Sequence, residues 1–183
     1  MSDNKVWDYE SKKNGIDCLG EQVKKHGKQL VMTNPEMAKH LLNRIKFEKG
    51  DRVLEPCRGD GAFYDNFPKF TINDYCEINE DKDFLTYDKG CEYCIANPPF
   101  IPRKLFWAFH LNAMRITTKE IYWLINMSAL NVFTPKRLGE MAEQNWFIEQ
   151  FHIVADKRWF GRYVWLRFSR TPNNIISYHK KVF

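Results

Sequence analysis

The chain has 183 residues, 44% of them hydrophobic, and a formal net charge of +5 at pH 7. This length and apolar content are typical of one globular domain, expected over residues 1–183 with an irregular or partly helical lead-in over residues 1–30. No run approaches the roughly 20 apolar residues that span a bilayer, and the first residues lack the apolar stretch of a secretory signal. The composition therefore argues against a membrane or secreted protein, and we expect a cytoplasmic one.

Cysteine usage points to reduced thiols. Five cysteines at irregular spacing in such a chain do not form a typical disulfide framework. Cys91 and Cys94 make one C-x-x-C pair without a second pair to complete a zinc site, so we expect two residues of a buried strand. No metal is predicted.

The positive charge is gathered in short clusters, the pattern with which proteins neutralise phosphates. Two adjacent clusters are Lys157, Arg158 and Arg162, with Trp159 and Phe160 among them, and then Arg167 and Arg170. Nucleobases stack on aromatic side chains, so this segment favours a nucleic-acid partner. A solvated face is the alternative.

The predicted elements alternate between strands and helices. Thr33, Pro35 and Glu36 predict the N-cap, first turn and capping box of a helix. Strands are predicted at Arg52–Glu55, Thr71–Ile78, Glu92–Ala96, Glu120–Met127, Phe147–Val154 and Tyr163–Phe168, and further helices at Arg103–Met114 and, after a Thr134 cap, Pro135–Gln144. The last two strands are joined too closely for a crossover helix, so they should form an antiparallel hairpin. The order predicts an α/β fold with a mostly parallel central sheet ending in that hairpin and flanked by helices.

The first predicted strand runs into a glycine-containing turn and then a predicted helix. Glu55 and Pro56 end the strand, and Gly59 and Gly61 follow in the turn. In a doubly wound sheet such a turn lies where cofactors bind, and glycine lets the backbone approach a ligand closely. An ordinary strand-to-helix turn is the alternative.

Acidic residues follow the next predicted strand. Glu77 is the kind of acceptor that a ribose diol needs, although an acid at a strand end can also be merely solvated. Asp83 could accept a hydrogen bond from an adenine amino group while the ring of Phe84 packs on the base plane.

The sharpest motif is Asn97-Pro98-Pro99-Phe100 directly after a predicted strand. Two prolines forbid both helix and sheet pairing there and hold their neighbours rigidly. An exocyclic amine conjugated to an aromatic ring is a poor nucleophile, and two acceptors on its hydrogens draw the lone pair out of conjugation. The Asn97 side-chain oxygen and the Pro98 carbonyl suit that role, with Phe100 stacking on the base. A plain Pro-Pro turn is the alternative.

With these motifs in this order, residues 30–170 resemble the amino-group methyltransferases of the Rossmann-like class I fold, especially the DNA adenine-N6 group. The resemblance implies S-adenosyl-L-methionine as cofactor. It places Thr33 in the segment that closes over the methionine part of the cofactor, and it forms the cofactor loop from Glu55, Pro56, Gly59 and Gly61. It places Glu77 at the ribose, Asp83 and Phe84 at the adenine, and Asn97 beside the cofactor. The catalytic tetrapeptide implied by the resemblance is Asn97, Pro98, Pro99 and Phe100.

The sequence departs from this family in two ways. Only five residues separate Glu77 from Asp83, so the usual helix there should be shortened or absent. No separate target-recognition domain follows, so sequence specificity should be low or supplied by a partner or an oligomer. The resemblance also suggests that Phe160, or alternatively Trp159, stacks on a flipped base, unless the hairpin tip is simply exposed.

The resemblance implies direct methyl transfer to N6 of a flipped or unpaired adenine in DNA. The residue pattern from Glu55 to Phe63 looks more like that of the DNA adenine group, which favours DNA as the substrate. Methylation of RNA at adenine N6 or guanine N2 is an alternative, because Asn-Pro-Pro-Phe also occurs in RNA enzymes. Glutamine methylation in a protein and a non-catalytic, nucleic-acid-binding subunit of a heteromeric methyltransferase are further alternatives, and the oligomeric state is left open.

Overall fold

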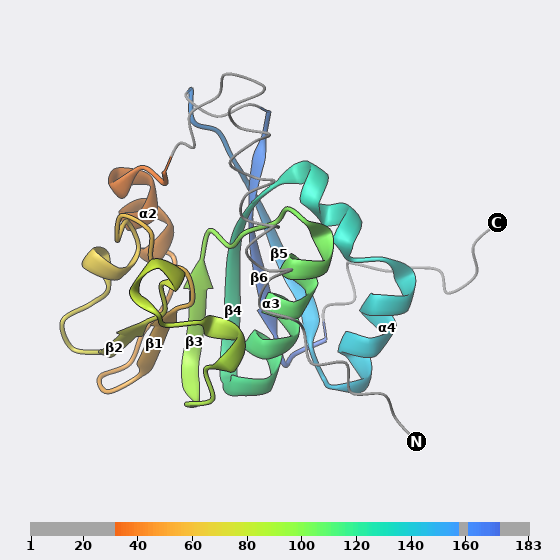
Figure 1. Cartoon of the computed structure of the whole chain (residues 1–183), viewed down its shortest axis with the longest axis horizontal. Helices are drawn as coiled ribbons and strands as arrows, with labels where there is room; N and C mark the ends of the chain where they lie inside the picture. Colours follow the sequence, from red (N-terminus) through yellow and green to blue (C-terminus); the bar gives the residue numbers. More distant parts are fainter. Residues whose placement is uncertain (1–31, 158–160, 173–183) are drawn as a thin grey trace. The chain divides into compact units, whose positions relative to one another are not determined.

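The computed structural model describes residues 32–157 and 161–172, and these residues build one mixed sheet (Figure 1). Its strands are β1 (Arg52–Glu55), β2 (Ile72–Tyr75), β3 (Cys91–Ala96), β4 (Thr117–Asn126), β5 (Phe147–Val154) and β6 (Tyr163–Ser169). They lie in the order β2-β1-β3-β4-β6-β5. Strands β2, β1, β3 and β4 are parallel, whereas β6 is antiparallel to both β4 and β5. The predicted fold class is therefore confirmed.

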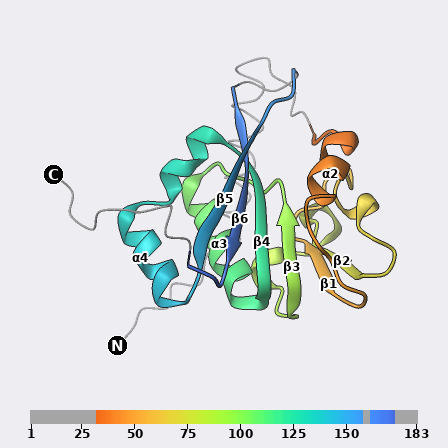
Figure 2. The same cartoon turned by 180° about the vertical axis from the view of Figure 1, so that it is seen from behind.

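Helices cover both faces of this sheet. The α-helices of the described residues are α2 (Pro35–Leu42), α3 (Arg103–Ile116) and α4 (Pro135–Glu143), and short 3-10 helices are η1 (Tyr64–Asn66), η2 (Ile78–Glu80), η3 (Phe84–Thr86) and η4 (Met127–Val132). Helices α3 and α4 pack on one face, and α2 packs on the other (Figures 1 and 2).

The two cores follow from the alternation of side chains along each strand. In β4, Ile121, Trp123 and Ile125 belong to the core under α3, whereas Tyr122 and Leu124 belong to the core under α2. All five side chains are buried. Strand β4 is thus covered on both faces, which explains why its sequence is a continuous apolar run.

The α2 side of the sheet is locked by aromatic stacking. Trp165 of β6 lies between Phe63 and Tyr122, at ring-centroid distances of 5.4 and 5.3 Å. Aromatic pairs of this kind add roughly 0.5–1.5 kcal/mol each beyond their burial. The contact with Phe63 fixes the segment after the glycine turn against the sheet.

On the α3 side, His110 is a core residue. It is fully buried, and its Nδ1 accepts a hydrogen bond of 3.0 Å from Trp123 Nε1. Burial lowers the pKa of His110 to about 3, so the ring is neutral at physiological pH. Its Nε2 atom has no partner among the described residues.

Three sequence predictions about local structure were wrong. The N-cap of α2 is Asn34, whose side chain accepts from the Glu36 amide at 2.9 Å, and not Thr33. The helix expected after Gly61 is only the single turn η1, because Pro68 leaves too few residues to nucleate an α-helix.

The third error is the length of the second strand. It ends at Tyr75 rather than at Ile78, since the Glu77 side chain accepts from the Asn79 amide and turns the chain into η2. The expected shortening of the helix between Glu77 and Asp83 is confirmed, because only the 3-10 turn η2 lies between them. The lead-in over residues 1–30 lies outside the described residues, so the single-domain organisation stays a prediction.

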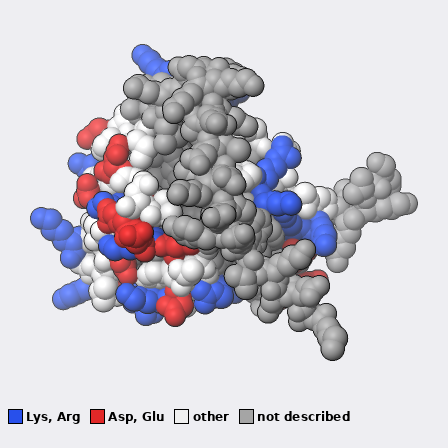
Figure 3. Space-filling view, in the orientation of Figure 1, with Lys and Arg blue, Asp and Glu red and all other residues white. Residues whose placement is uncertain are grey.

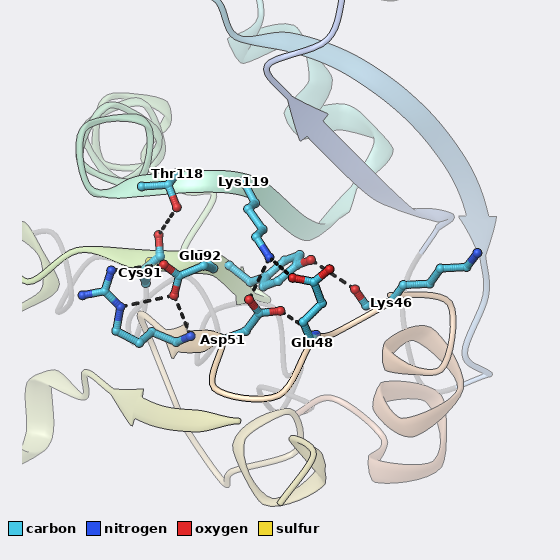
Figure 4. A network of polar contacts seen from close by, with 9 residues as sticks. Lys46, Glu48, Asp51, Cys91, Glu92, Thr118 and Lys119 are labelled. Carbon is cyan, nitrogen blue, oxygen red and sulfur yellow. Dashed lines mark hydrogen bonds and ion pairs between the residues drawn. The ribbon is translucent and has the colours of Figure 1, made fainter. Parts of the chain in front are cut away.

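The amino-terminal edge of the parallel strands is held by a polar network (Figure 4). The Asp51 carboxylate, 6% exposed, accepts from Lys119 Nζ at 2.8 Å and from the Glu48 amide at 2.7 Å. Nearby, Glu92 of β3 pairs with Arg52 of β1. The network joins β1, β3 and β4 at the edge opposite the ends of the strands that carry the sequence motifs.

We expect Asp51→Ala to lower the free energy of unfolding by about 2 kcal/mol, because the Glu48 amide loses its acceptor and Lys119 loses its closest partner. Chemical denaturation would measure it. Glu48→Ala is the matched control. It removes the other carboxylate that pairs with Lys119. The Glu48 side chain is 78% exposed, so its loss should lower the free energy of unfolding by no more than about 0.5 kcal/mol. Equal effects of the two substitutions would contradict the role of Asp51 as the central acceptor of this network.

Candidate active site

The site lies where the strand order reverses, between β1 and β3, at the carboxyl ends of these strands. The arrowhead of β3 marks this edge in Figure 2. The loops that follow the two strands touch, because Cys57 Sγ donates to the Asn97 carbonyl oxygen at 3.4 Å. The glycine turn and the tetrapeptide, 40 residues apart in sequence, are thus brought together.

The loop after β1 turns sharply. Gly61 has a φ of +82° and is buried, and a Cβ at this position would lie 2.8 Å from Asp65 Oδ2. Gly59 also has a positive φ, and a Cβ there would meet the end of Met32. Pro56 is buried beneath the turn. The loop therefore has a tight backbone path that glycine alone accepts comfortably.

Glu55, at the end of β1, is directed into the protein. It is 2% exposed, and its Oε2 accepts from the Tyr64 amide at 2.7 Å. Burial raises the pKa of this carboxyl to about 9. Glu55 thus anchors the start of η1 behind the glycine turn.

The raised pKa makes stability depend on pH. The folded state retains the Glu55 proton up to about pH 9, whereas the ordinary pKa of a glutamate side chain is 4.5. The contribution of Glu55 to the free energy of unfolding is therefore full below pH 4.5 and decreases as the pH rises toward 9. We expect Glu55→Gln to remove this decrease, so that the unfolding free energy of the variant rises relative to the native protein between pH 5 and 9. Denaturant titrations at several pH values would measure it. Parallel curves would contradict a protonated Glu55.

Glu77 reaches back to the glycine turn. Its Oε2 accepts from the Gly59 amide at 2.8 Å, and its Oε1 accepts from the Asn79 amide at 3.2 Å. The acid predicted at the ribose therefore lies beside the predicted cofactor loop. Two acceptor sites of the carboxylate are engaged, and a carboxylate has about four.

Asp83 and Phe84 are divided between surface and core. Asp83 is half-buried and its Oδ1 accepts from the Leu85 amide at 2.9 Å, which caps η3. Phe84 is 2% exposed and packs on Phe109 of α3. Of this predicted pair, Asp83 is the residue that presents atoms outside the core.

In the tetrapeptide, the Asn97 side chain contacts Thr33. Its Nδ2 donates to Thr33 Oγ1 at 3.2 Å. Among the described residues, neither its Oδ1 nor the carbonyl of the buried Pro98 receives a hydrogen bond. Within the described part of the chain these two acceptors have no donor, and Thr33, Pro99 and Phe100 are half-buried.

Phe100 connects the tetrapeptide to the terminal hairpin. Its ring meets Tyr163 of β6 edge to face at 6.3 Å, and Tyr163 pairs with Asn126 at the carboxyl end of β4. The turn end of the hairpin therefore borders the site. Lys157 and Arg162, in the turn, are exposed.

Some of the predicted nucleic-acid contacts lie elsewhere. Arg158, Trp159 and Phe160 lie outside the described residues. Arg167, predicted within a basic cluster, forms ion pairs with Glu120 and Glu149. Arg170 lies 4.1 Å from the Trp146 ring and donates to two backbone carbonyls. These last two arginines stabilise the fold.

Sequence reasoning missed two of the contacts that shape the site. Tyr163 was assigned only to a strand, and the proximity of Met32 to Gly59 depends on a segment before α2 that has no strong local pattern. In the described part of the chain, no group of three or more acidic, histidine or cysteine side chains is placed to hold a metal ion. No helix there is both long and apolar enough to cross a membrane.

Comparison of the sequence with protein-family models and with curated proteins gives no match. Solved structures do match. A putative class I S-adenosylmethionine-dependent methyltransferase from Listeria monocytogenes has a TM-score of 0.59 at 14% identity, over 97% of this chain and 73% of that one. The chain has the class I methyltransferase fold. The 23S rRNA methyltransferase ErmE (TM-score 0.58, 14% identity, 81% and 72% coverage) is similar to it.

A third similar structure is a dimethyladenosine transferase from Plasmodium falciparum, with a TM-score of 0.58 and 12% identity over 76% of this chain and 62% of that one. In the class I methyltransferase fold of the present chain, the candidate residues lie at the switch point of the sheet, where such folds bind ligands.

Proposed function

We propose that this chain is an S-adenosylmethionine-dependent methyltransferase whose target is the N6 amino group of adenine in a nucleic acid. One observation carries the proposal. Among the described residues, Asn97 Oδ1 and the Pro98 carbonyl are unoccupied acceptors at the switch point, directly beside the glycine turn. Two adjacent acceptors match the two hydrogens of an exocyclic amine.

The residues around the turn fit the cofactor. Gly59 and Gly61 give the turn its tight backbone path, Glu77 would offer carboxylate oxygens to the ribose diol, and Asp83 would offer an acceptor to the adenine amino group. Thr33, which accepts from Asn97 Nδ2, would contact the methionine part. Phe84 would support this region from the core.

The cofactor, when bound, supplies an electrophilic methyl group on a sulfonium. Asn97 and Pro98 would hold the two amino hydrogens so that the nitrogen lone pair leaves the plane of the base. Direct transfer would form a nitrogen–carbon bond in place of the sulfur–carbon bond, with the bonding pair left on sulfur and one amino proton released to solvent. The protein contributes mainly position and electrostatics.

The flipped or unpaired base would lie against Phe100, with Phe160 or Trp159 of the hairpin on its other face and with Lys157, Arg158 and Arg162 near its phosphates. The residue pattern of the loop from Glu55 to Phe63 supports DNA as the substrate. RNA is the second candidate, since a similar structure is an rRNA methyltransferase.

The test is nucleoside mass spectrometry after incubation with methyl-deuterated S-adenosylmethionine and either duplex DNA, single-stranded DNA or RNA. The deuterium label distinguishes the transferred methyl group from any already present. We expect labelled N6-methyladenine, and we expect DNA to be the better substrate. Label only in RNA would replace the DNA assignment, and label in no lane would overturn the proposal.

Thr33 is expected to be a positioning residue of this reaction. Thr33→Val keeps the shape of the side chain but removes the acceptor for Asn97 Nδ2. The amide can then rotate, so we expect kcat to fall about tenfold while the KM for the cofactor stays within about twofold. Thr33→Ser restores the acceptor and should restore kcat. A decrease that serine does not reverse would indicate a merely structural role.

A further inference from the structure

A basic cleft lies outside the site described above, where α3 and α4 begin. It is open to solvent, has a volume of about 510 Å³ and is lined by Arg103, Trp107, Asn131, Thr134, Lys136, Arg137 and Glu140. Three of these residues are cations and one is an acid. In Figure 3 the Lys and Arg side chains gather over the region of η4 and α4.

The cations are placed against the preference of the helices. Arg103 and Lys104 open α3, and Lys136 and Arg137 lie in the first turn of α4, and neither first turn contains an acid. A helix amino terminus carries partial positive charge, so each cation there costs up to about 1 kcal/mol. A bound polyanion would offset that cost.

The cleft is also preorganised. The Arg137 guanidinium lies 4.7 Å from the ring centroid of the half-buried Trp107, and its Nη1 donates to the Val132 carbonyl at 2.9 Å. A guanidinium has five N–H donors, so others remain for a ligand. Among the described residues Arg103 has no acidic partner, and Lys136 meets only Glu140, at 3.9 Å.

The place of the cleft connects it to the site. Arg103 follows Phe100 of the tetrapeptide by three residues, and η4 follows the carboxyl end of β4. Both the site and the cleft thus lie on the edge of the sheet at which β3 and β4 end. A strand whose base occupies the slot at Phe100 has a phosphodiester backbone that can continue along this edge.

We propose that this cleft binds the phosphodiester backbone of the substrate nucleic acid next to the target nucleotide. The inference rests on the proposed function for the identity of the substrate. Arg103, Lys136 and Arg137 contact phosphate oxygens, with Arg137 held in place by Trp107. Phosphate contacts of this kind position a strand without reading its sequence, which suits an enzyme with little sequence specificity.

The test uses the double variant Arg103→Gln, Lys136→Gln and a fluorescein-labelled single strand of about 20 nucleotides, as DNA and as RNA. Anisotropy gives the affinity at several salt concentrations. The slope of log affinity against log salt should become shallower by about 0.7 for each phosphate that the variant no longer neutralises. Lys49→Gln, Lys69→Gln is the matched control, because it removes the same charge from exposed turns around β1 and β2.

An unchanged slope in the cleft variant, or an equal change in the control, would overturn the proposal. Calorimetric titration with S-adenosylmethionine should give the native affinity for both variants, which shows that each is folded. The cleft and the catalytic function fail separately: a shallower slope without methyl transfer by the native chain leaves the cleft standing, and methyl transfer with an unchanged slope removes the cleft alone.

Discussion

Replacing Asn97 with alanine is expected to lower kcat for adenine methylation by about 10²–10³, the range seen when one group that stabilises a transition state is removed. The side chain provides one of two acceptors at the switch point, and its amide is oriented by Thr33. Only the transition state needs the amino hydrogens held out of the base plane. The decrease should therefore appear in kcat, measured by single-turnover methyl transfer, with little change in substrate affinity.

Two controls separate chemistry from damage to the fold. The affinity for S-adenosylmethionine, measured by calorimetry, should stay within about threefold in Asn97→Ala, because the variant keeps the backbone that meets Cys57. Asn97→Asp retains an acceptor in the same position and should lose less activity than Asn97→Ala. Activity within about threefold of the native rate in Asn97→Ala would remove this residue from the mechanism.

The features that were predictable from the sequence are those encoded locally. The apolar run of β4, the Thr134 cap of α4 and the hairpin of β5 and β6 each depend on neighbouring residues, and each is present. The proximity of the glycine turn to Asn97 was also predictable, because parallel strands end at the same edge of a sheet.

The predictions failed where side chains compete to accept hydrogen bonds from backbone amides. Asn34 and Thr33 can both cap a helix, and Asn34, directly before Pro35, is the N-cap of α2. At Glu77 a side-chain acceptor captures the Asn79 amide and ends a strand that the apolar pattern would continue.

Long-range arrangements were less accessible still. The basic cleft brings together the first turns of two helices that begin 32 residues apart in the sequence. Each pair of cations looks like a solvated face when read alone. The available signal was that both predicted helices open with basic rather than acidic residues, against the helix dipole.

Replacing Glu77 with alanine is expected to raise the Kd for S-adenosylmethionine at least about 100-fold. Hydrogen bonds to a charged acceptor contribute roughly 1.5–3 kcal/mol each, and a ribose diol can donate two. The carboxylate also holds the Gly59 amide, so the glycine turn loses its anchor in the variant. Glu80→Ala is the matched control, because it removes a neighbouring carboxylate, that of Glu80 in η2, which pairs with Arg58. It should change the Kd less than about threefold.

A modified ligand separates the ribose contact from the anchoring of the turn. S-adenosylhomocysteine that lacks both ribose hydroxyls should bind the native chain much more weakly than the intact compound. In Glu77→Ala the two ligands should bind almost equally, because the partner of the hydroxyls is absent. If the variant still prefers the intact ribose by the native factor, another residue binds the diol and Glu77 acts only through the Gly59 amide.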